Sequence, residues 1–275
     1  YNSRCNKYKK ILRKAYNRYL KEPSVKTDTA NCGDGMQSAI NSLNKPREYQ
    51  LTDQQQPNIL YVDGLSAQTY WTEENFVSDI TILEANTEQI IREFEHVYNC
   101  VWPDGWLVNN TPSGQWAVYH LINQGIPIKK NCDTCPKTYA VLQQLVSTMT
   151  KSVFANASFS VVQSGTHITP HYGPTNVRVR CHLGLKVSNP DMSYITVGGE
   201  KGSWETGKCL LFDDSFLHEV HHTDIEQQAR AVLLIDLWHP DLTQTEKDLV
   251  DNLFKFERAE IPVRSTIPVP MAPEL

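Results

Sequence analysis

Hydrophobic residues in the second half of the chain fall into short runs that glycines separate. The runs cover residues 157–163, 177–187, 194–197, 208–212 and 229–237. Each run has the length and residue types of a β-strand. Residues 177–183 alternate strictly, which places Arg178, Arg180 and His182 on one face and apolar residues on the other. Short strands at this density predict a jelly roll or another small barrel with a cationic inner face that suits anions.

The first half of the chain contains helical patterns. Residues 83–98 place apolar side chains on one side of a helix, with Asn86 and Glu88 near its start. A second helix is predicted at 137–149, entered through Pro136. Between the two helices, residues 116–122 have the composition of a strand. The fold class that we predict is therefore mainly β with flanking helices.

The N-terminal residues differ from the rest of the chain. Residues 5–21 predict a basic amphipathic helix, and a short helix at 35–43 could pair with it. Such a helix can contact an anionic membrane surface, but packing against neighbouring elements is the favoured interpretation. Residues 44–57 are polar and proline-containing, which is typical of a linker. We divide the chain into an N-terminal helical segment with its linker at 1–56 and a main domain at 57–275.

Composition narrows the class of protein. The 275 residues are 40% hydrophobic, enough for one large domain with a real core. The net charge of -5 argues against nucleic acid as a partner. The sequence shows no membrane span or signal peptide, but it begins at Tyr1 rather than Met. We therefore expect any membrane anchor to lie upstream of this sequence.

Cysteines and glycosylation sequons bear on the compartment. Seven cysteines leave at least one thiol unpaired in a monomer, and Cys132 and Cys135 stand close enough for a redox or zinc half-site. No second such pair exists, which argues against a zinc site; a Cys132–Cys135 bridge stays open. Sequons begin at Asn109 and Asn156. Together these features favour, weakly, a glycoprotein of the secretory-pathway lumen.

Two histidines stand out as candidate metal ligands. In jelly-roll oxygenases one histidine follows an early strand and a second lies some tens of residues later, and neutral imidazoles bind Fe(II) well. His171 and His218 fit this arrangement. The usual third ligand is a carboxylate two residues after the first histidine, where this chain has Gly173. On the residues alone, either there is no iron site or water fills the third position.

Four motifs resemble the aspartyl/asparaginyl β-hydroxylase family over most of residues 58–250. They are HYGPTN at 171–176, RCHLGL at 180–185, FDDSFLHEV at 212–220 and DLWHPDL at 236–242. The resemblance implies a cupin-like double-stranded β-helix that uses Fe(II), O2 and 2-oxoglutarate. It implies hydroxylation of Asp or Asn in EGF-like domains, and a protein anchored in the endoplasmic reticulum membrane. The family has a two-histidine iron site without the carboxylate, so Gly173 fits the resemblance.

The resemblance also implies roles for single residues. Arg230 and Ser160 would bind the distal carboxylate of 2-oxoglutarate, for which a guanidinium is well suited. His182 would lie near the same co-substrate, and Arg180 with Arg178 near the substrate carboxylate. One of these three could instead only balance buried charge. For Trp116, lining the pocket and packing in the core are equally favoured interpretations.

Other conspicuous residues receive less weight. Asp213 and Asp214 are interpreted as a tight turn before His218, and His221 and His222 as solvent-facing. The family carries a cysteine-bridged loop in the region of Cys132, where this chain has a different arrangement. Two competing hypotheses remain beside the dioxygenase. One is a catalytically silent jelly roll that serves as a binding or scaffold module, and the other is a zinc hydrolase that leaves Arg230 without a task.

Overall fold

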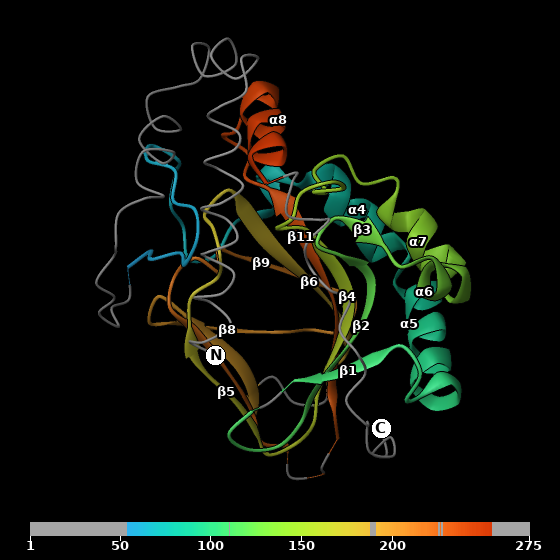
Figure 1. Cartoon of the computed structure of the whole chain (residues 1–275). Coiled ribbons are helices and arrows are strands. Elements are labelled where there is room, and N and C mark those ends of the chain that lie inside the picture. Colours follow the sequence, from blue (N-terminus) through green and yellow to red (C-terminus); the bar gives the residue numbers. More distant parts are fainter. Residues whose placement is uncertain (1–53, 110, 188–190, 225, 227, 255–275) are drawn as a thin grey trace.

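Two antiparallel β-sheets form the body of the computed structural model (Figure 1). The structure describes residues 54–254 apart from residues 110, 188–190, 225 and 227. The helices predicted at 5–21 and 35–43, and nearly all of the predicted segment 1–56, lie outside the described residues.

The larger sheet has seven strands in the order β1-β2-β4-β11-β6-β9, with β3 paired to β2. Their bounds are β1 Trp106–Asn109, β2 Trp116–Asn123, β3 Ile126–Pro127, β4 Asn156–Val162, β6 Arg178–Lys186, β9 Cys209–Phe212 and β11 Arg230–Trp238. The smaller sheet has the order β5-β10-β7-β8. Its strands are β5 Thr166–His171, β7 Ser193–Val197, β8 Glu200–Ser203 and β10 His218–His222.

The path of the chain through strands β4 to β11 defines the fold. The chain alternates between the sheets from β4 to β7 and from β8 to β11, with β7 and β8 consecutive in the smaller sheet. The two orders β4-β11-β6-β9 and β5-β10-β7-β8 are those of a double-stranded β-helix. The predicted fold class is confirmed. The topology makes β5 and β10 hydrogen-bonded neighbours although they are far apart in the sequence.

Helices cover the outer face of the larger sheet (Figure 1). They are the 3-10 helix η2 Glu73–Asn75, α4 Val77–Ala85, α5 Thr87–His96, the π-helix η3 Val97–Val101, α6 Lys129–Thr134 and α7 Pro136–Leu142. The last helix, α8 Gln244–Leu253, instead packs in a separate apolar cluster that includes Phe154 and Trp238. On α5, Ile90 and Phe94 lie one turn apart and are buried against the sheet. A capping box between Thr243 and Glu246 starts α8.

Alternation along the strands separates two apolar clusters. On β11, Leu233 belongs to the core beneath the helices, whereas Val232 packs between the two sheets. Trp204, Phe212 and Val220 pack with Val232 in that inner cluster. The inner face of the larger sheet therefore lines the interior of the barrel, where its polar residues also lie.

The predicted elements largely agree with the structure. All five predicted strands after residue 150 lie within one residue of an observed strand, and the strand at 116–122 is β2. The helix predicted at 83–98 begins at Thr87, because residues up to Ala85 belong to α4. The helix predicted at 137–149 ends at Leu142, where the chain turns so that the N–H groups of Val146 and Ser147 donate to the buried Asp79 carboxylate.

The cysteines form no disulfide among the described residues. Cys100, Cys132, Cys135, Cys181 and Cys209 are all free thiols, so the Cys132–Cys135 bridge that the sequence left open is not present. The Cys132 thiol donates to the carbonyl of Leu121 at 3.2 Å. Burial raises the pKa of Cys132 to about 11 and that of Cys135 to about 12. Both are inert core residues rather than reactive groups.

Two features of the described residues bear on the compartment. Within the described chain no helix combines the length and the hydropathy that crossing a membrane requires. The side-chain amide of Asn156 donates to Asp236 at 3.0 Å, and its oxygen accepts from the N–H of Gln124 at 3.3 Å. The side chain of one of the two sequon asparagines is thus hydrogen-bonded within the folded protein.

Candidate functional site

The two candidate metal ligands lie side by side on the smaller sheet. His171 is the last residue of β5 and His218 is the first of β10, and their Cα atoms are partners in the strand register. The ring centroids are 4.1 Å apart with an interplanar angle of 51°. His218 is buried and His171 half-buried. The structure thus brings together two residues that spacing alone could only suggest.

Hydrogen bonds fix which nitrogen of each ring carries the proton. The Nδ1 of His171 contacts the carbonyl of Thr169 at 2.8 Å, and the Nδ1 of His218 contacts that of Phe216 at 3.0 Å. A carbonyl can only accept, so Nδ1 carries the proton and Nε2 the lone pair. Burial and the neighbouring His171 lower the pKa of His218 to about 3, and burial lowers that of His171. Both are neutral imidazoles, the form that binds metals.

Gly173 leaves no room for a side chain. A Cβ atom at this position would lie 2.5 Å from both Cγ and Oδ2 of Asp214, and 2.7 Å from its carbonyl oxygen. The N–H of Gly173 donates to that carbonyl at 2.6 Å. The Asp214 carboxylate therefore occupies the space into which a carboxylate-bearing side chain at 173 would project.

Arg230, the first residue of β11, is a buried cation. Its exposed fraction is 2%, and its Nε and Nη1 have no hydrogen-bond partner among the residues that the structure describes. The guanidinium lies over the ring of Trp204, 4.1 Å from the centroid, and burial lowers its pKa to about 9. A buried guanidinium with unsatisfied donors is costly unless an anion pairs with it. Arg230 therefore has the properties of an anion-binding residue.

His182 presents a second buried donor close to Arg230. Its Nδ1 accepts a hydrogen bond from the indole N–H of Trp204 at 3.1 Å. Because that indole can only donate, the proton of the neutral imidazole is on Nε2, which has no partner in the described part of the chain. Burial, followed by the charge of Arg230, holds the pKa of His182 well below its usual range. Trp204 thus contacts two of the predicted co-substrate residues.

Ser160 and Trp116 extend the same face of the larger sheet. The indole N–H of Trp116 donates to the Ser160 hydroxyl oxygen at 3.1 Å. In the register of β4 and β11, Val162 is opposite Arg230 and Ser160 is opposite Val232. Ser160 therefore lies diagonally beside Arg230 on the inner face, where Val232 also packs.

Arg178 and Arg180 are already paired with carboxylates. Arg178 is 3% exposed and contacts Asp214 at 2.5 Å and Asp236 at 3.2 Å. Arg180 is less buried and contacts Asp214 at 3.1 Å and Asp236 at 2.9 Å. Of the two interpretations left open by the sequence, balancing buried charge fits Arg178 better than binding substrate. The excess positive charge of the barrel interior lies at the Arg230 end.

Some residues differ from their sequence interpretation. Asp213 forms the expected turn, because its carboxylate accepts from the N–H of Ser215 at 2.8 Å. His222 was expected to face solvent but is fully buried, with Nε2 2.7 Å from the carbonyl of Gln228. Trp204 and Asp236 carried no assigned role. Trp204 gave no signal that separates it from a core tryptophan, whereas Asp236 is the first residue of one of the four quoted motifs.

Comparison with known proteins identifies relatives. Residues 84–240 match the family model described as aspartyl/asparaginyl beta-hydroxylase. The aspartate beta-hydroxylase domain-containing protein 2 of Xenopus tropicalis is 43% identical over 73% of this chain and 55% of its own length. The aspartyl/asparaginyl beta-hydroxylase of Mus musculus is 31% identical over 70% of this chain and 26% of its own. The solved structure of the α-ketoglutarate-dependent epimerase SnoN from nogalamycin biosynthesis is 9% identical, with a TM-score of 0.37, and the match covers 70% of this chain and 86% of that one. The chain spans about half the length of the Xenopus relative.

Proposed function

The chain belongs to the aspartyl/asparaginyl β-hydroxylase family, and from that premise we propose that it is an Fe(II)- and 2-oxoglutarate-dependent dioxygenase that hydroxylates Asp or Asn side chains of polypeptides at the β-carbon. The guanidinium of Arg230, whose Nε and Nη1 have no partner among the described residues, lies buried in a barrel that also presents two neutral histidines, and this carries the proposal. A barrel kept only as a scaffold has no use for a buried cation without a counterion.

Fe(II) fits the donor set of His171 and His218. Both rings are neutral, and both have Nδ1 fixed on a backbone carbonyl, so Nε2 is the coordinating atom. Gly173 provides no third protein ligand, so water would fill that position. When bound, iron and 2-oxoglutarate supply the oxidation, in which O2 converts 2-oxoglutarate to succinate and carbon dioxide and delivers one oxygen atom to the substrate C–H bond.

Three donors suit the distal carboxylate of 2-oxoglutarate. The Arg230 guanidinium offers buried N–H groups on Nε and Nη1 that have no hydrogen-bond partner among the described residues. The Ser160 oxygen accepts from Trp116, so its own O–H remains to donate. The Nε2–H of His182, held as a donor by Trp204, completes the set. These groups lie between low-dielectric walls, where each hydrogen bond to an anion is strengthened.

The substrate is proposed from its chemistry and from the family. Arg180 is the more exposed of the two paired arginines and is the one proposed to meet the acidic or amide side chain of a polypeptide, while Arg178 balances the charge of Asp214. EGF-like domains in the lumen of the endoplasmic reticulum are the proposed substrates. The compartment and a membrane anchor outside this sequence are part of this proposal.

Succinate formation tests the proposal. The protein is incubated with Fe(II), 2-oxoglutarate, O2 and EGF-like peptides that contain Asp or Asn, and succinate and oxygenated peptide are both quantified. We expect both products from the natural chain, and at least a hundredfold loss in Arg230→Ala, because a buried charge-assisted contact to the co-substrate disappears. Arg92→Ala, on the exposed face of α5, is the control and should retain activity. Turnover that is equal in both variants, or absent from the natural chain, would contradict the proposal.

A further inference from the structure

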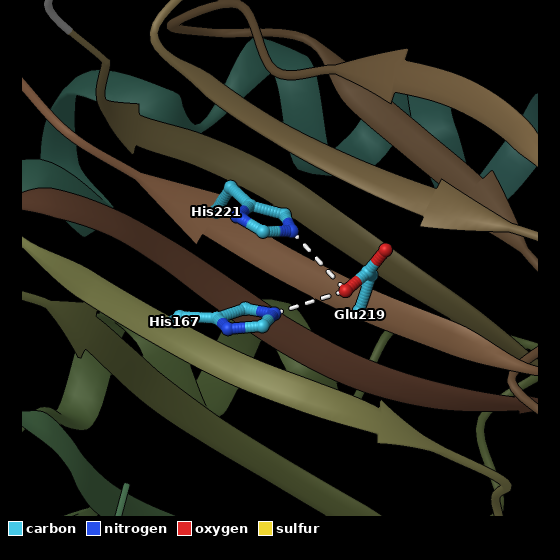
Figure 2. A group of neighbouring side chains, drawn as sticks. All are labelled: His167, Glu219 and His221. Carbon is cyan, nitrogen blue, oxygen red and sulfur yellow. Dashed lines mark hydrogen bonds and ion pairs between the residues drawn. The ribbon is translucent and has the colours of Figure 1, made fainter. Parts of the chain in front are cut away.

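The smaller sheet carries a second group of metal-ligating side chains (Figure 2). His167 on β5 and His221 on β10 both direct Nε2 at the same Oε2 atom of Glu219, at 2.9 and 3.1 Å. The three ligand atoms all lie within 4.8 Å of one another, and all three residues are half-buried. Two imidazole nitrogens and one carboxylate oxygen form a donor set that transition metals prefer.

This group is separate from His171 and His218. Along β10, His218, Val220 and His222 are buried, whereas Glu219 and His221 between them are half-buried. Alternation therefore places Glu219 and His221 on the outer face of the sheet, opposite the inner face on which His218 lies. Neither residue takes part in the co-substrate site.

The group is held in place by its neighbours. His167 and His221 are direct cross-strand partners, and their rings stack with centroids 4.1 Å apart and an interplanar angle of 20°. Tyr194 stacks on the other side of His221 at 5.0 Å, and the Nζ of Lys201 lies over Tyr194 at 4.1 Å. The two imidazoles have therefore lost much of their rotational freedom before any ligand binds, which lowers the entropic cost of coordination.

We propose that His167, Glu219 and His221 bind a divalent transition-metal ion of the zinc type, as a second metal site on the outer face of the smaller sheet. Zinc is bound by histidine nitrogen and carboxylate oxygen at roughly 2.0–2.2 Å, and three protein ligands with one open position form a recognised tetrahedral arrangement. Donor atoms on such a sphere lie roughly 3–3.5 Å apart, and the two separations from Glu219 Oε2, 2.9 and 3.1 Å, are already close to this. On binding, each Nε2 gives its lone pair to the metal while the ring proton resides on Nδ1.

The position of this site gives it a structural consequence. A metal ion here would link β5 to β10, the two strands that carry His171 and His218. The pairing of β10 with β5 has an irregular register between His218 and Val220, which interrupts the regular ladder between the two strands. A cross-link through the metal would reinforce this pairing. The outer ion would thus fix the relative position of the two inner histidines without contacting the co-substrate.

Zinc stoichiometry tests the proposal. The metal-free chain is titrated with Zn2+ in the absence of Fe(II). The titration measures the number of zinc ions bound per chain and the dissociation constant of each. We expect His221→Gln and Glu219→Gln each to bind one zinc ion fewer than the natural chain, or to bind it at least tenfold more weakly. Both substitutions are at the surface of the sheet. His218→Ala should retain the outer ion, so the proposed iron site and this site fail independently.

Two matched controls separate a built site from adventitious binding. His96→Gln removes an exposed histidine from α5, and Cys100→Ser removes an exposed thiol. Both should bind zinc like the natural chain. Unchanged stoichiometry and affinity in His221→Gln and Glu219→Gln would overturn the proposal. An equal loss in the control variants would overturn it as well.

Discussion

At the scale of single residues, the position of one proton distinguishes the histidines of the site. His171 and His218 donate from Nδ1 to backbone carbonyls and so present Nε2 as a lone pair. His182 accepts at Nδ1 from Trp204 and so presents Nε2 as a donor. The same side chain therefore offers a lone pair at two positions, as a metal ligand requires, and an N–H donor at a third, as an anion requires.

Replacing Trp204 tests this assignment. Trp204→Phe keeps an aromatic face beneath Arg230 but removes the N–H that fixes the tautomer of His182. Losing one such hydrogen bond costs about 1 kcal/mol, so we expect the KM for 2-oxoglutarate to rise roughly fivefold with little change in kcat. Trp71→Phe is the matched control, because the indole N–H of Trp71 has no partner among the described residues. An equal KM in the two variants would argue against a role for Trp204.

A second prediction concerns Gly173. Gly173→Ala should lower the free energy of unfolding by roughly 1–3 kcal/mol, because its Cβ would overlap the Asp214 carboxylate. Gly173→Asp should be less stable still and should not bind Fe(II) more tightly. Gly165→Ala serves as control, since that position has a positive φ but open space, and should cost about 1 kcal/mol. Urea unfolding measures each value, and a Gly173→Asp variant with natural stability and improved iron affinity would refute this account.

Some of these residues could be predicted from the sequence, and others could not. His171 and His218 could be proposed because their type and spacing suit iron binding and the quoted motifs contain them. Arg230 could be proposed only because the family resemblance implies an arginine there. Trp204 could not, because a tryptophan between glycines is equally typical of a core. Its role depends on which rings approach it in three dimensions, namely His182 and the guanidinium of Arg230.

At the scale of elements, β6 and β11 share a network of buried charge. Asp236 on β11 is directly opposite Arg180 on β6, and Asp214 approaches both Arg178 and Arg180 from the segment before β10. Two cations and two carboxylates thus neutralise one another at this end of the barrel. The network ties the segment that precedes His218 to the larger sheet.

Removing one member of this network should be costly. Burial raises the pKa of Asp214, but the charges of Arg178 and Arg180 outweigh it and hold the pKa well below its ordinary value. We expect Asp214→Asn to lower the free energy of unfolding by about 3–5 kcal/mol at pH 7, because Arg178 is left with a single counterion. Asp133→Asn, an exposed control on α6, should change it by less than about 0.5 kcal/mol.

The pH dependence of this difference has a defined sign. A carboxylate with a lowered pKa stabilises the fold at pH values above its unfolded pKa, which is 3.8 for aspartate. That contribution is lost as the pH falls below this value toward the folded pKa. The gap between the natural chain and Asp214→Asn should therefore narrow below about pH 4. A gap that stays constant down to about pH 2 would contradict the assignment.

Elements were predicted best where packing dominates their composition. The runs that became β4, β6, β7, β9 and β11 are rich in apolar residues that alternate or fill the core. Strands β5 and β10 were not predicted because histidines, together with threonine and proline, replace the β-branched apolar pattern in them. The helix predicted at 137–149 is too long for a different reason. After Leu142 the backbone N–H of Val146 donates to the carboxylate of Asp79, which is distant in the sequence, rather than continuing the helix.

At the scale of the whole molecule, the buried charge of Arg230 lowers the stability that the apolar core provides. The core beneath the helices and the inner cluster between the sheets stabilise the barrel. Within that barrel, Arg230 is a buried cation whose counterion is absent from the described residues. Sites of this kind are commonly destabilised in the absence of their ligand.

Substituting Arg230 should reveal this trade-off. Arg230→Met has similar volume and no charge, so we expect it to raise the free energy of unfolding of the ligand-free protein by about 1 kcal/mol while abolishing stabilisation by 2-oxoglutarate. Chemical unfolding with and without 2-oxoglutarate and Fe(II) measures both effects. Arg92→Met, at an exposed position, should change neither. A loss of more than about 2 kcal/mol in Arg230→Met would mean that the guanidinium is fully satisfied in the ligand-free fold.

The most direct test is the visible charge-transfer absorption of an iron–2-oxoglutarate chelate, measured without oxygen. Fe(II) and then 2-oxoglutarate are added to the natural chain and to His218→Ala, with His96→Gln as the control. We predict the band in the natural chain and in His96→Gln, and its loss in His218→Ala. No band in the natural chain, or a band that survives in His218→Ala, would contradict the assignment of His171 and His218 as the iron ligands.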